Sequence, residues 1–253
     1  GMIVAGDNLF DKEEKSDLPL AIGAGRTFSA IMQLMCFDHL VTAVLDRDRS
    51  GITIENKRAF QRALLSRMAG IGTLEGSEEQ GVSKVLGVEE MIERVHRIRG
   101  GELFALAFVA PAIWESEDSQ RRWQQAEKGI AAIGTAFQIV DDVTDFEFDL
   151  TRQSHNLLSA QIVHHGTESE QLAFRNIQQS GSCPADAVEN QFAESARAVL
   201  ERARIEAERG FNDLAELGFW FPPSDAALFV RAIAGDAGDA RIDALNEPAT
   251  AQQ

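Results

Sequence analysis

The sequence has no tyrosine, few prolines and only two cysteines. Cys36 and Cys183 are too few for a disulfide framework, and they fit a protein of the reducing cytoplasm. No uninterrupted run of eighteen apolar residues occurs, so we expect no membrane-spanning segment. The first residues reach Asp7 without a basic stretch, which argues against a signal peptide. These absences predict a cytoplasmic protein with no stable membrane insertion.

Basic residues are scarce relative to acidic ones. The chain has 24 Lys and Arg against 40 Asp and Glu, a net charge of −16, and the acids are spread along its length. A field of that sign repels nucleic acid and anionic membrane surfaces, so we expect neither as a partner. The share of hydrophobic residues, 44%, is ordinary for a globular protein and sufficient for a large core.

Several motifs of well-known chemistry are also absent. There is no Gly-rich phosphate loop, no Gly-x-Ser-x-Gly elbow and no cysteine pair suited to zinc. Adjacent side chains on a helix do not converge on a metal, so His164 and His165 indicate a helix end near Gly166. The isolated His39 and His96 favour structural roles.

Apolar residues recur at steps of three and four, which is typical of helices. No convincing two-residue alternation is present, so no sheet is predicted. Phe219-Trp220-Phe221 is interpreted as a core plug or a dimer contact, and Cys36 as a buried residue. The pattern predicts one all-α domain, 1–253, of about eight to ten helices. Predicted helices cover 26–46, 88–114, 119–149 and 185–217, with breaks at 48–51, 74–77, 180–184 and 221–223.

The chemical signal lies in residues 134–145. On a helix, Asp141 and Asp145 stand at i and i+4 and project from one face, and Asp149 continues the row. Asp142 lies about a third of a turn away. Such a row suits a hard cation such as Mg²⁺, whose ligands are oxygens. A solvated acidic face is the alternative, although the apolar run before the acids favours partial burial, and these residues alone leave the two readings evenly balanced.

A second acidic cluster stands near the start of the chain. Asp7 and Asp11 are again at i and i+4, with Asn8 between them. Taken alone, this cluster favours a solvated helix terminus. Two aspartate-bearing helices that face each other across an all-α bundle could, however, hold several Mg²⁺ ions and a diphosphate.

The sequence resembles the trans-isoprenyl diphosphate synthases, or polyprenyl synthetases, of the class I isoprenoid synthase fold. Residues 134–145 match the second aspartate-rich motif of that family, including Phe137-Gln138 before the aspartate pair. Residues 7–11 are similar to the first motif, with Asn8 where an aspartate is usual. Residues 99–104 resemble the Lys-Thr-Gly-x-Leu-Phe segment, with Arg99 in the position of the diphosphate-binding lysine. The resemblance runs from Asp7 to about residue 221.

The resemblance implies a helical bundle around a central cavity, usually a homodimer. It implies ionisation of an allylic prenyl diphosphate with Mg²⁺, followed by condensation with isopentenyl diphosphate into a geranyl-, farnesyl- or geranylgeranyl-type diphosphate. The implied metal ligands are Asp7, Asp11, Asp141, Asp142 and Asp145. The implied catalytic residues are Asp141, Asp142, Arg99 and Gln138, and the implied substrate contacts are Arg99, Gln138 and Asn8.

The sequence also departs from the family pattern. Residues 12–15 include two acids where the family has an arginine pair for isopentenyl diphosphate, Gly100 replaces a threonine, and residues 146–152 replace a Gly-Lys loop. The chain starts almost at the first motif, although the family has several helices before it. Two alternatives therefore stay open: a class I terpene synthase, which the all-aspartate second motif disfavours, and a non-catalytic partner subunit.

Overall fold

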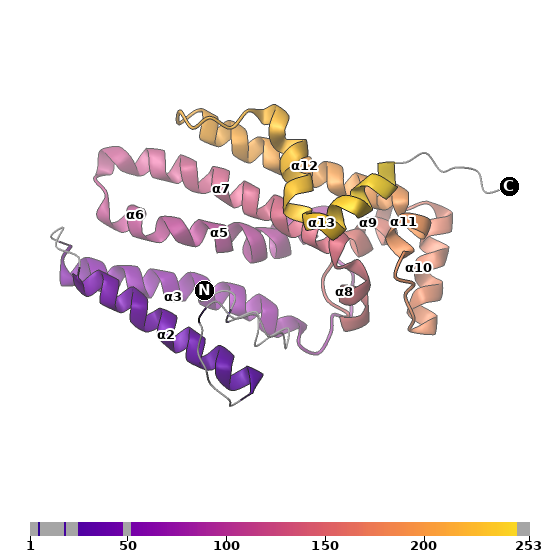
Figure 1. Cartoon of the computed structure of the whole chain (residues 1–253), viewed down its shortest axis with the longest axis horizontal. Coiled ribbons are helices and arrows are strands. Elements are labelled where there is room, and N and C mark those ends of the chain that lie inside the picture. The colour runs from indigo at the N-terminus through magenta and orange to yellow at the C-terminus, as the bar shows by residue number, and fades with distance from the viewer. Residues whose placement is uncertain (1–4, 6–17, 19–24, 48–51, 247–253) are drawn as a thin grey trace. The chain divides into compact units, whose positions relative to one another are not determined.

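The computed structural model describes residues 5, 18, 25–47 and 52–246. Every regular element in these residues is a helix, and none of them is in a strand, which confirms the all-α prediction (Figure 1). The chain divides into two compact units, residues 1–62 and 63–253, and the boundary lies inside helix α3 (Ile54–Glu78). Organisation as a single domain stays a prediction.

The first unit contains α2 (Arg26–Arg47) and the start of α3. Helix α2 confirms the helix predicted over 26–46, and Asp46 forms an ion pair of 3.5 Å with Lys57. Cys36 is half-buried, so its predicted burial is only partial. Helix α2 is long and apolar enough to cross a membrane by length and composition alone, a test that core helices and signal sequences also pass. The absence of membrane insertion therefore stays a prediction.

The second unit is built around α7 (Glu117–Thr144), which packs chiefly against α12 and the π-helix η1 (Figure 1). A tight glycine contact lets η1 approach: a Cβ placed on Gly100 would collide with the carbonyl oxygen of Gly134 on α7. The other elements are α4 (Val88–Met91), η1 (Ile92–Glu102), α5 (Leu103–Ala105), η2 (Leu106–Phe108), α6 (Val109–Trp114), α8 (Phe146–Arg152), α9 (Leu157–His165), α10 (Glu168–Ser180), α11 (Ala187–Gln191), α12 (Ala193–Ala215), η3 (Pro223–Asp225) and α13 (Ala226–Asn246).

Several predicted helix boundaries are wrong. The break expected at 74–77 is absent, because α3 continues through Gly76, a residue that a helix tolerates at a cost of about 1 kcal/mol. The helix predicted over 185–217 is interrupted at Phe192, whose ring is fully buried against Phe146 and Phe174. The helix predicted over 119–149 ends at Thr144. The helical segment predicted over 88–114 is confirmed in its bounds, because helical turns run without a break from Val88 to Trp114, although η1 and η2 within it are π- and 3₁₀-helical. Burial and long-range contacts decide these boundaries, and local periodicity does not report them.

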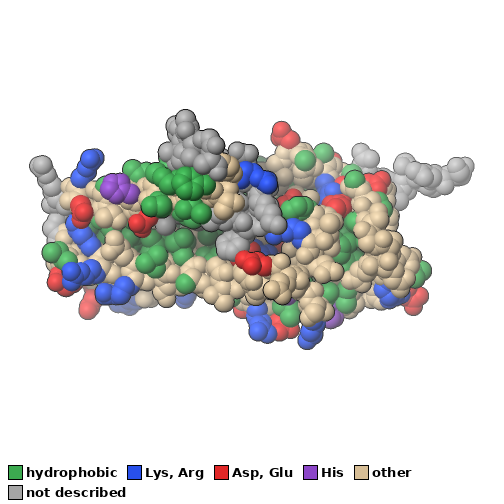
Figure 2. All heavy atoms as spheres, turned by 90° about the horizontal axis from the view of Figure 1, so that it is seen from below, with side chains coloured by type: hydrophobic (Ala, Val, Ile, Leu, Met, Phe, Trp, Pro, Cys, Tyr) green, Lys and Arg blue, Asp and Glu red, His purple; other side chains and the backbone are tan. Residues whose placement is uncertain are grey.

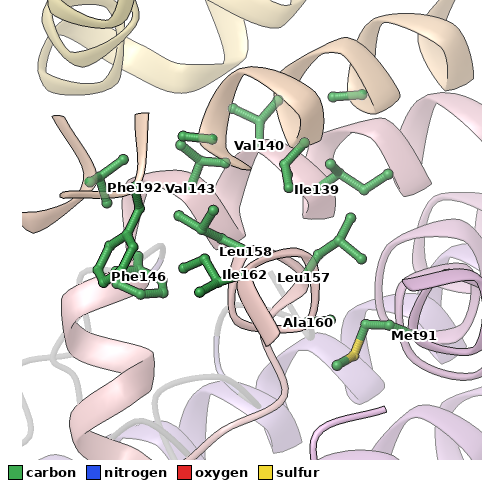
Figure 3. Packing of buried hydrophobic residues seen from close by; sticks show 14 of the residues in the cluster. Met91, Ile139, Val140, Val143, Phe146, Leu157, Leu158, Ala160, Ile162 and Phe192 are labelled. Atoms are coloured by element: carbon green, nitrogen blue, oxygen red, sulfur yellow. The ribbon is translucent and has the colours of Figure 1, made fainter. Parts of the chain in front are cut away.

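The main hydrophobic core lies beside the C-terminal end of α7 (Figure 3). Val143 of α7 and Phe146 of α8 are almost fully buried there, together with Leu157, Leu158 and Ile162 of α9. Each such side chain contributes about 1.5–3 kcal/mol when it is fully buried. The last turn of α7 is therefore anchored by packing, and the acidic side chains project from an anchored element.

The surface differs from one expectation. Phe219, Trp220 and Phe221 are 52%, 86% and 43% exposed, so the predicted core plug is wrong, and the dimer contact stays a prediction. His164 and His165 end α9 before Gly166, as predicted. On the face drawn in Figure 2, Lys and Arg side chains alternate with Asp and Glu, and the described side chains form no continuous basic stripe there.

Candidate functional site

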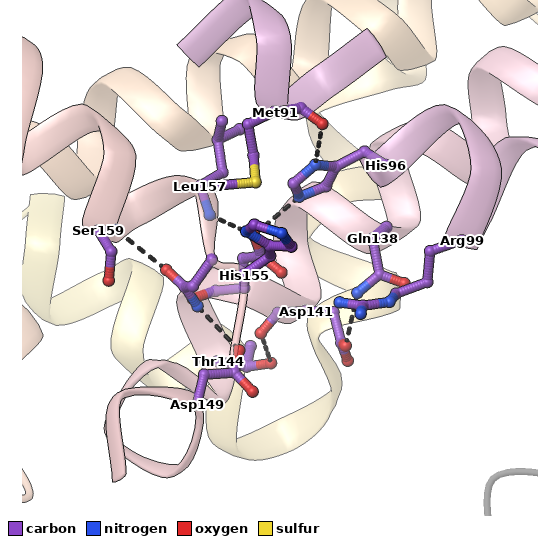
Figure 4. A network of polar contacts seen from close by, with 12 residues as sticks. Met91, His96, Arg99, Gln138, Asp141, Thr144, Asp149, His155, Leu157 and Ser159 are labelled. Carbon is purple, nitrogen blue, oxygen red and sulfur yellow. Dashed lines mark hydrogen bonds and ion pairs between the residues drawn. The ribbon is translucent and has the colours of Figure 1, made fainter. Parts of the chain in front are cut away.

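The predicted acidic residues of the second motif lie at the C-terminal end of α7 (Figure 4). Gln138 is buried, and its Nε2 donates to Asp141 Oδ2 at 3.1 Å. Asp145 caps the helix and is exposed. The amide of Gln138 thus orients the Asp141 carboxylate, and both residues come from one turn of α7.

Asp142 points the other way, into the protein. Its carboxylate is 1% exposed, and its Oδ2 accepts from His96 Nε2 at 2.7 Å and from the backbone N–H of Leu157. His96 is equally buried, with Nδ1 3.2 Å from the carbonyl of Met91. Asp142 was predicted to be a metal ligand on a partly buried face, and the structure gives its carboxylate buried hydrogen-bond partners. Its role as a metal ligand stays a prediction, and His96 takes the structural role expected of it.

Asp149 joins the same cluster from α8. The chain bends at Asp145, so Asp149 does not continue the row of α7, which corrects the sequence interpretation. Its Oδ2 accepts from Asn156 Nδ2 at 2.9 Å, and Asn156 also caps α9. Burial, followed by the charge of Asp142, raises the pKa of Asp149 to about 8.

The pKa of Asp141 is also raised, to about 7. Burial is the main cause, and the charges of Asp145 and Asp142 add to it, while Gln138 and Arg99 oppose the shift. Crowded carboxylates of this kind favour a bound proton or a cation. The donor set of Asp141 and Asp145, hard carboxylate oxygens, fits Mg²⁺. Among the described residues no group of three or more His, Cys, Asp or Glu side chains converges as a metal site.

Arg99 lies near Asp141, but it is already paired with α3 (Figure 4). Its Nε donates to Glu75 at 2.6 Å and its Nη2 donates to Glu78 at 2.7 Å. Burial alone would lower the pKa of Arg99, but the charges of Glu75 and Glu78 outweigh it and raise the pKa above its ordinary value. The predicted cationic contact to diphosphate is therefore a guanidinium held between two carboxylates.

Glu75 and Glu78 were not predicted as site residues, because a helix break was expected at 74–77. The i, i+3 spacing of two acids on a continuous helix was the available signal. Glu78 Oε2 also accepts from the backbone N–H of His155 at 3.0 Å. His155 lies within the network of Figure 4, its Nδ1 is buried without a hydrogen-bond partner, and burial is the main cause that lowers its pKa. No spacing in the sequence indicated His155.

The remaining predicted site residues, Asp7, Asn8 and Asp11, lie outside the described residues. A surface cavity of about 440 Å³ lies between α4, α9 and α12, and none of the aspartates discussed above lines it. Shape alone would direct attention to that cavity. The buried carboxylates instead favour the end of α7 as the candidate site, because shifted carboxylate pKa values indicate chemistry better than the shape of a cavity does.

Two solved structures resemble this chain. The geranylgeranyl pyrophosphate synthetase of Pyrococcus horikoshii Ot3 superposes with a TM-score of 0.60 at 17% identity, over 92% of this chain and 75% of that one. This chain has a trans-isoprenyl diphosphate synthase-like fold. A polyprenyl synthase from Roseobacter denitrificans gives a TM-score of 0.46 at 18% identity, over 92% of this chain and 94% of that one. No protein-family model and no curated protein sequence matches the chain.

Proposed function

We propose that the chain is a Mg²⁺-dependent prenyltransferase that ionises an allylic prenyl diphosphate and condenses it with isopentenyl diphosphate. The observation that carries the proposal is the crowded carboxylate of Asp141 beside Asp145, on a fold like that of a geranylgeranyl pyrophosphate synthetase. Carboxylates in this state bind a divalent cation in exchange for a proton. A homodimer in the cytoplasm is part of the same proposal.

Each residue of the cluster has a distinct role in this proposal. Asp141 and Asp145 would hold the cation, and Gln138 fixes the orientation of Asp141. Bound magnesium would supply charge neutralisation for the departing diphosphate. Asp142 stays in its buried bonds with His96 and fixes the last turn of α7 against α9.

The state of Arg99 favours a second candidate function. Two glutamates neutralise its charge, so Arg99 offers diphosphate little attraction until its ion pairs with Glu75 and Glu78 open. A protein that keeps this arrangement would bind metal at α7 but would bind a diphosphate substrate weakly. A non-catalytic partner subunit is therefore the alternative, and the presence or absence of turnover separates the two.

The test is incubation of the protein with Mg²⁺ and geranyl or farnesyl diphosphate, with and without isopentenyl diphosphate, followed by product analysis. We expect a longer prenyl diphosphate only when both substrates are present, and none in EDTA. A hydrocarbon or alcohol formed without isopentenyl diphosphate would indicate a terpene synthase. No turnover, together with Mg²⁺-dependent binding of a non-hydrolysable analogue, would support the partner subunit. Turnover in EDTA would contradict the metal site.

A further inference from the structure

Helix α13 reaches the acidic end of α7 by a bend. Gly235 has φ 67° and ψ −178°, a conformation that residues with a Cβ rarely adopt. Beyond the bend, Gly238 lies against α7 so closely that an added Cβ would stand 2.7 Å from the side-chain methyl of Thr144. The sequence offered no sign that the C-terminal helix approaches the second aspartate-rich motif.

Arg241, one turn beyond Gly238, spreads its guanidinium over the end of α7. Its Nη1 donates to the carbonyls of Val143 at 2.7 Å and Thr144 at 3.2 Å. The other contacts are ion pairs, with Nη2 3.0 Å from Glu147 and Nε 2.8 Å from Glu189. The side chain is 13% exposed, so these contacts are largely shielded from water.

These contacts complete the end of α7. The last four carbonyls of a helix have no partner within it. Here the carbonyl of Asp141 accepts from the N–H of Asp145, and that of Asp142 accepts from Asn156 Nδ2. The other two, those of Val143 and Thr144, accept from Arg241. A cation at a helix C-terminus is also favoured by the helix dipole, and only the planar fork of arginine reaches carbonyls and carboxylates together.

We propose that Arg241 is a positioning residue for the acidic cluster. By closing the last turn of α7 through the carbonyls of Val143 and Thr144, it fixes the direction in which Asp141 and Asp145 project. The catalytic consequence rests on the proposed function, because a defined metal geometry needs carboxylates held in place.

A purely structural clamp is the alternative, and Arg197 provides a matched control. Its Nε donates at 2.6 Å to the carbonyl of Leu245, so it tethers the same end of α13, but its described hydrogen bond does not reach α7. Loss of either arginine should loosen α13. Only the loss of Arg241 should alter the acidic cluster.

The experiment compares Arg241→Gln, Arg241→Lys and Arg197→Gln with wild type. The first readout is the Mg²⁺ concentration for half-maximal turnover of geranyl and isopentenyl diphosphates. The second is hydrogen exchange of the amides of Asp145 and Asp149, whose N–H groups bond to carbonyls of the preceding turn. We expect Arg241→Gln to raise the Mg²⁺ requirement and the exchange rates about tenfold, the usual effect of losing a charge-assisted hydrogen bond. Arg241→Lys should be intermediate, which also covers the case in which Arg241→Gln does not fold.

Arg197→Gln should lower the melting temperature without changing the Mg²⁺ requirement or the exchange rates of Asp145 and Asp149. Equal Mg²⁺ requirements and equal exchange rates in the Arg241 and Arg197 variants would overturn the positioning role. Wild-type protein with neither turnover nor Mg²⁺-dependent binding of a diphosphate analogue would instead refute the proposed function. In that case the exchange comparison alone decides whether Arg241 positions the end of α7.

Discussion

Two charged clusters of the second unit differ in how their charge is balanced. At the end of α7, Asp141, Asp142 and Asp149 gather with no cation bonded directly to the carboxylates of Asp141 or Asp149 in the described contacts. Between α3 and η1, Arg99 is held by Glu75 and Glu78. In the described contacts two glutamates neutralise the charge of Arg99, whereas the carboxylates of Asp141 and Asp149 are crowded by like charge. We therefore expect changes in the first cluster to affect Mg²⁺ binding and changes in the second to affect stability.

The largest expected effect comes from breaking the uncompensated cluster. Asp141→Asn keeps the size of the side chain and its hydrogen bond with Gln138 but removes the charge that a cation needs. We expect Mg²⁺-dependent turnover to fall by about 10²–10³-fold, corresponding to about 3–4 kcal/mol of transition-state stabilisation. Steady-state kinetics at saturating Mg²⁺ measures the loss.

Asp118→Asn is the matched control, because Asp118 lies in the first turn of the same helix and is exposed. Its removal should change turnover by less than about twofold, as expected of a surface substitution. If the two variants turned over at equal rates, the acidic cluster would not be the site of chemistry.

Substitutions in the cluster of Arg99, Glu75 and Glu78 should instead lower the stability of the fold. Glu78 is 6% exposed, and its carboxylate serves both Arg99 and the backbone of His155. Glu78→Gln leaves a buried cation with one partner fewer, and we expect a loss of about 2–4 kcal/mol in the free energy of unfolding, measured by urea denaturation.

Glu201→Gln removes an exposed partner of Arg204 and should leave the urea midpoint almost unchanged, because solvent screens surface ion pairs. Similar losses in the two variants would mean that the clamp on Arg99 is no stronger than a surface ion pair. In that case Arg99 would be available to a diphosphate, and the comparison between the clusters would fail.

The sequence predicted the first cluster far better than the second. Spacing along one helix is local information, so the all-α class, α2 and the position of Asp141 beside Gln138 followed from periodicity and motif. The partners of Arg99 could not be predicted from local spacing, because Glu75 and Glu78 lie more than twenty residues earlier on another helix.

The same limit explains other differences between prediction and structure. Glycine marked a false turn in α3, since a helix tolerates Gly76 when neighbouring residues are held by tertiary contacts. Arg241, 97 and 98 residues from the carbonyls that it binds, has no local signature at all. Tertiary partners of charged groups are decided by packing, which spacing along the chain does not encode.

The smallest expected effect is a change in how the stability of the protein depends on pH. The pKa of Asp149 is raised to about 8 by burial and by Asp142, against an ordinary value of 3.8 in the unfolded chain. The folded state therefore holds a proton that the unfolded state releases, so the contribution of Asp149 to stability is greatest below pH 4 and is lost as the pH rises towards 8. Asp149→Asn removes this dependence and keeps an oxygen that can accept from Asn156. We expect equal stability near pH 4 and a higher melting temperature for the variant than for wild type at pH 8. Melting curves from pH 4 to 9 without divalent ions measure it, and a variant with the same pH slope as wild type would show that Asp149 is not crowded by uncompensated charge.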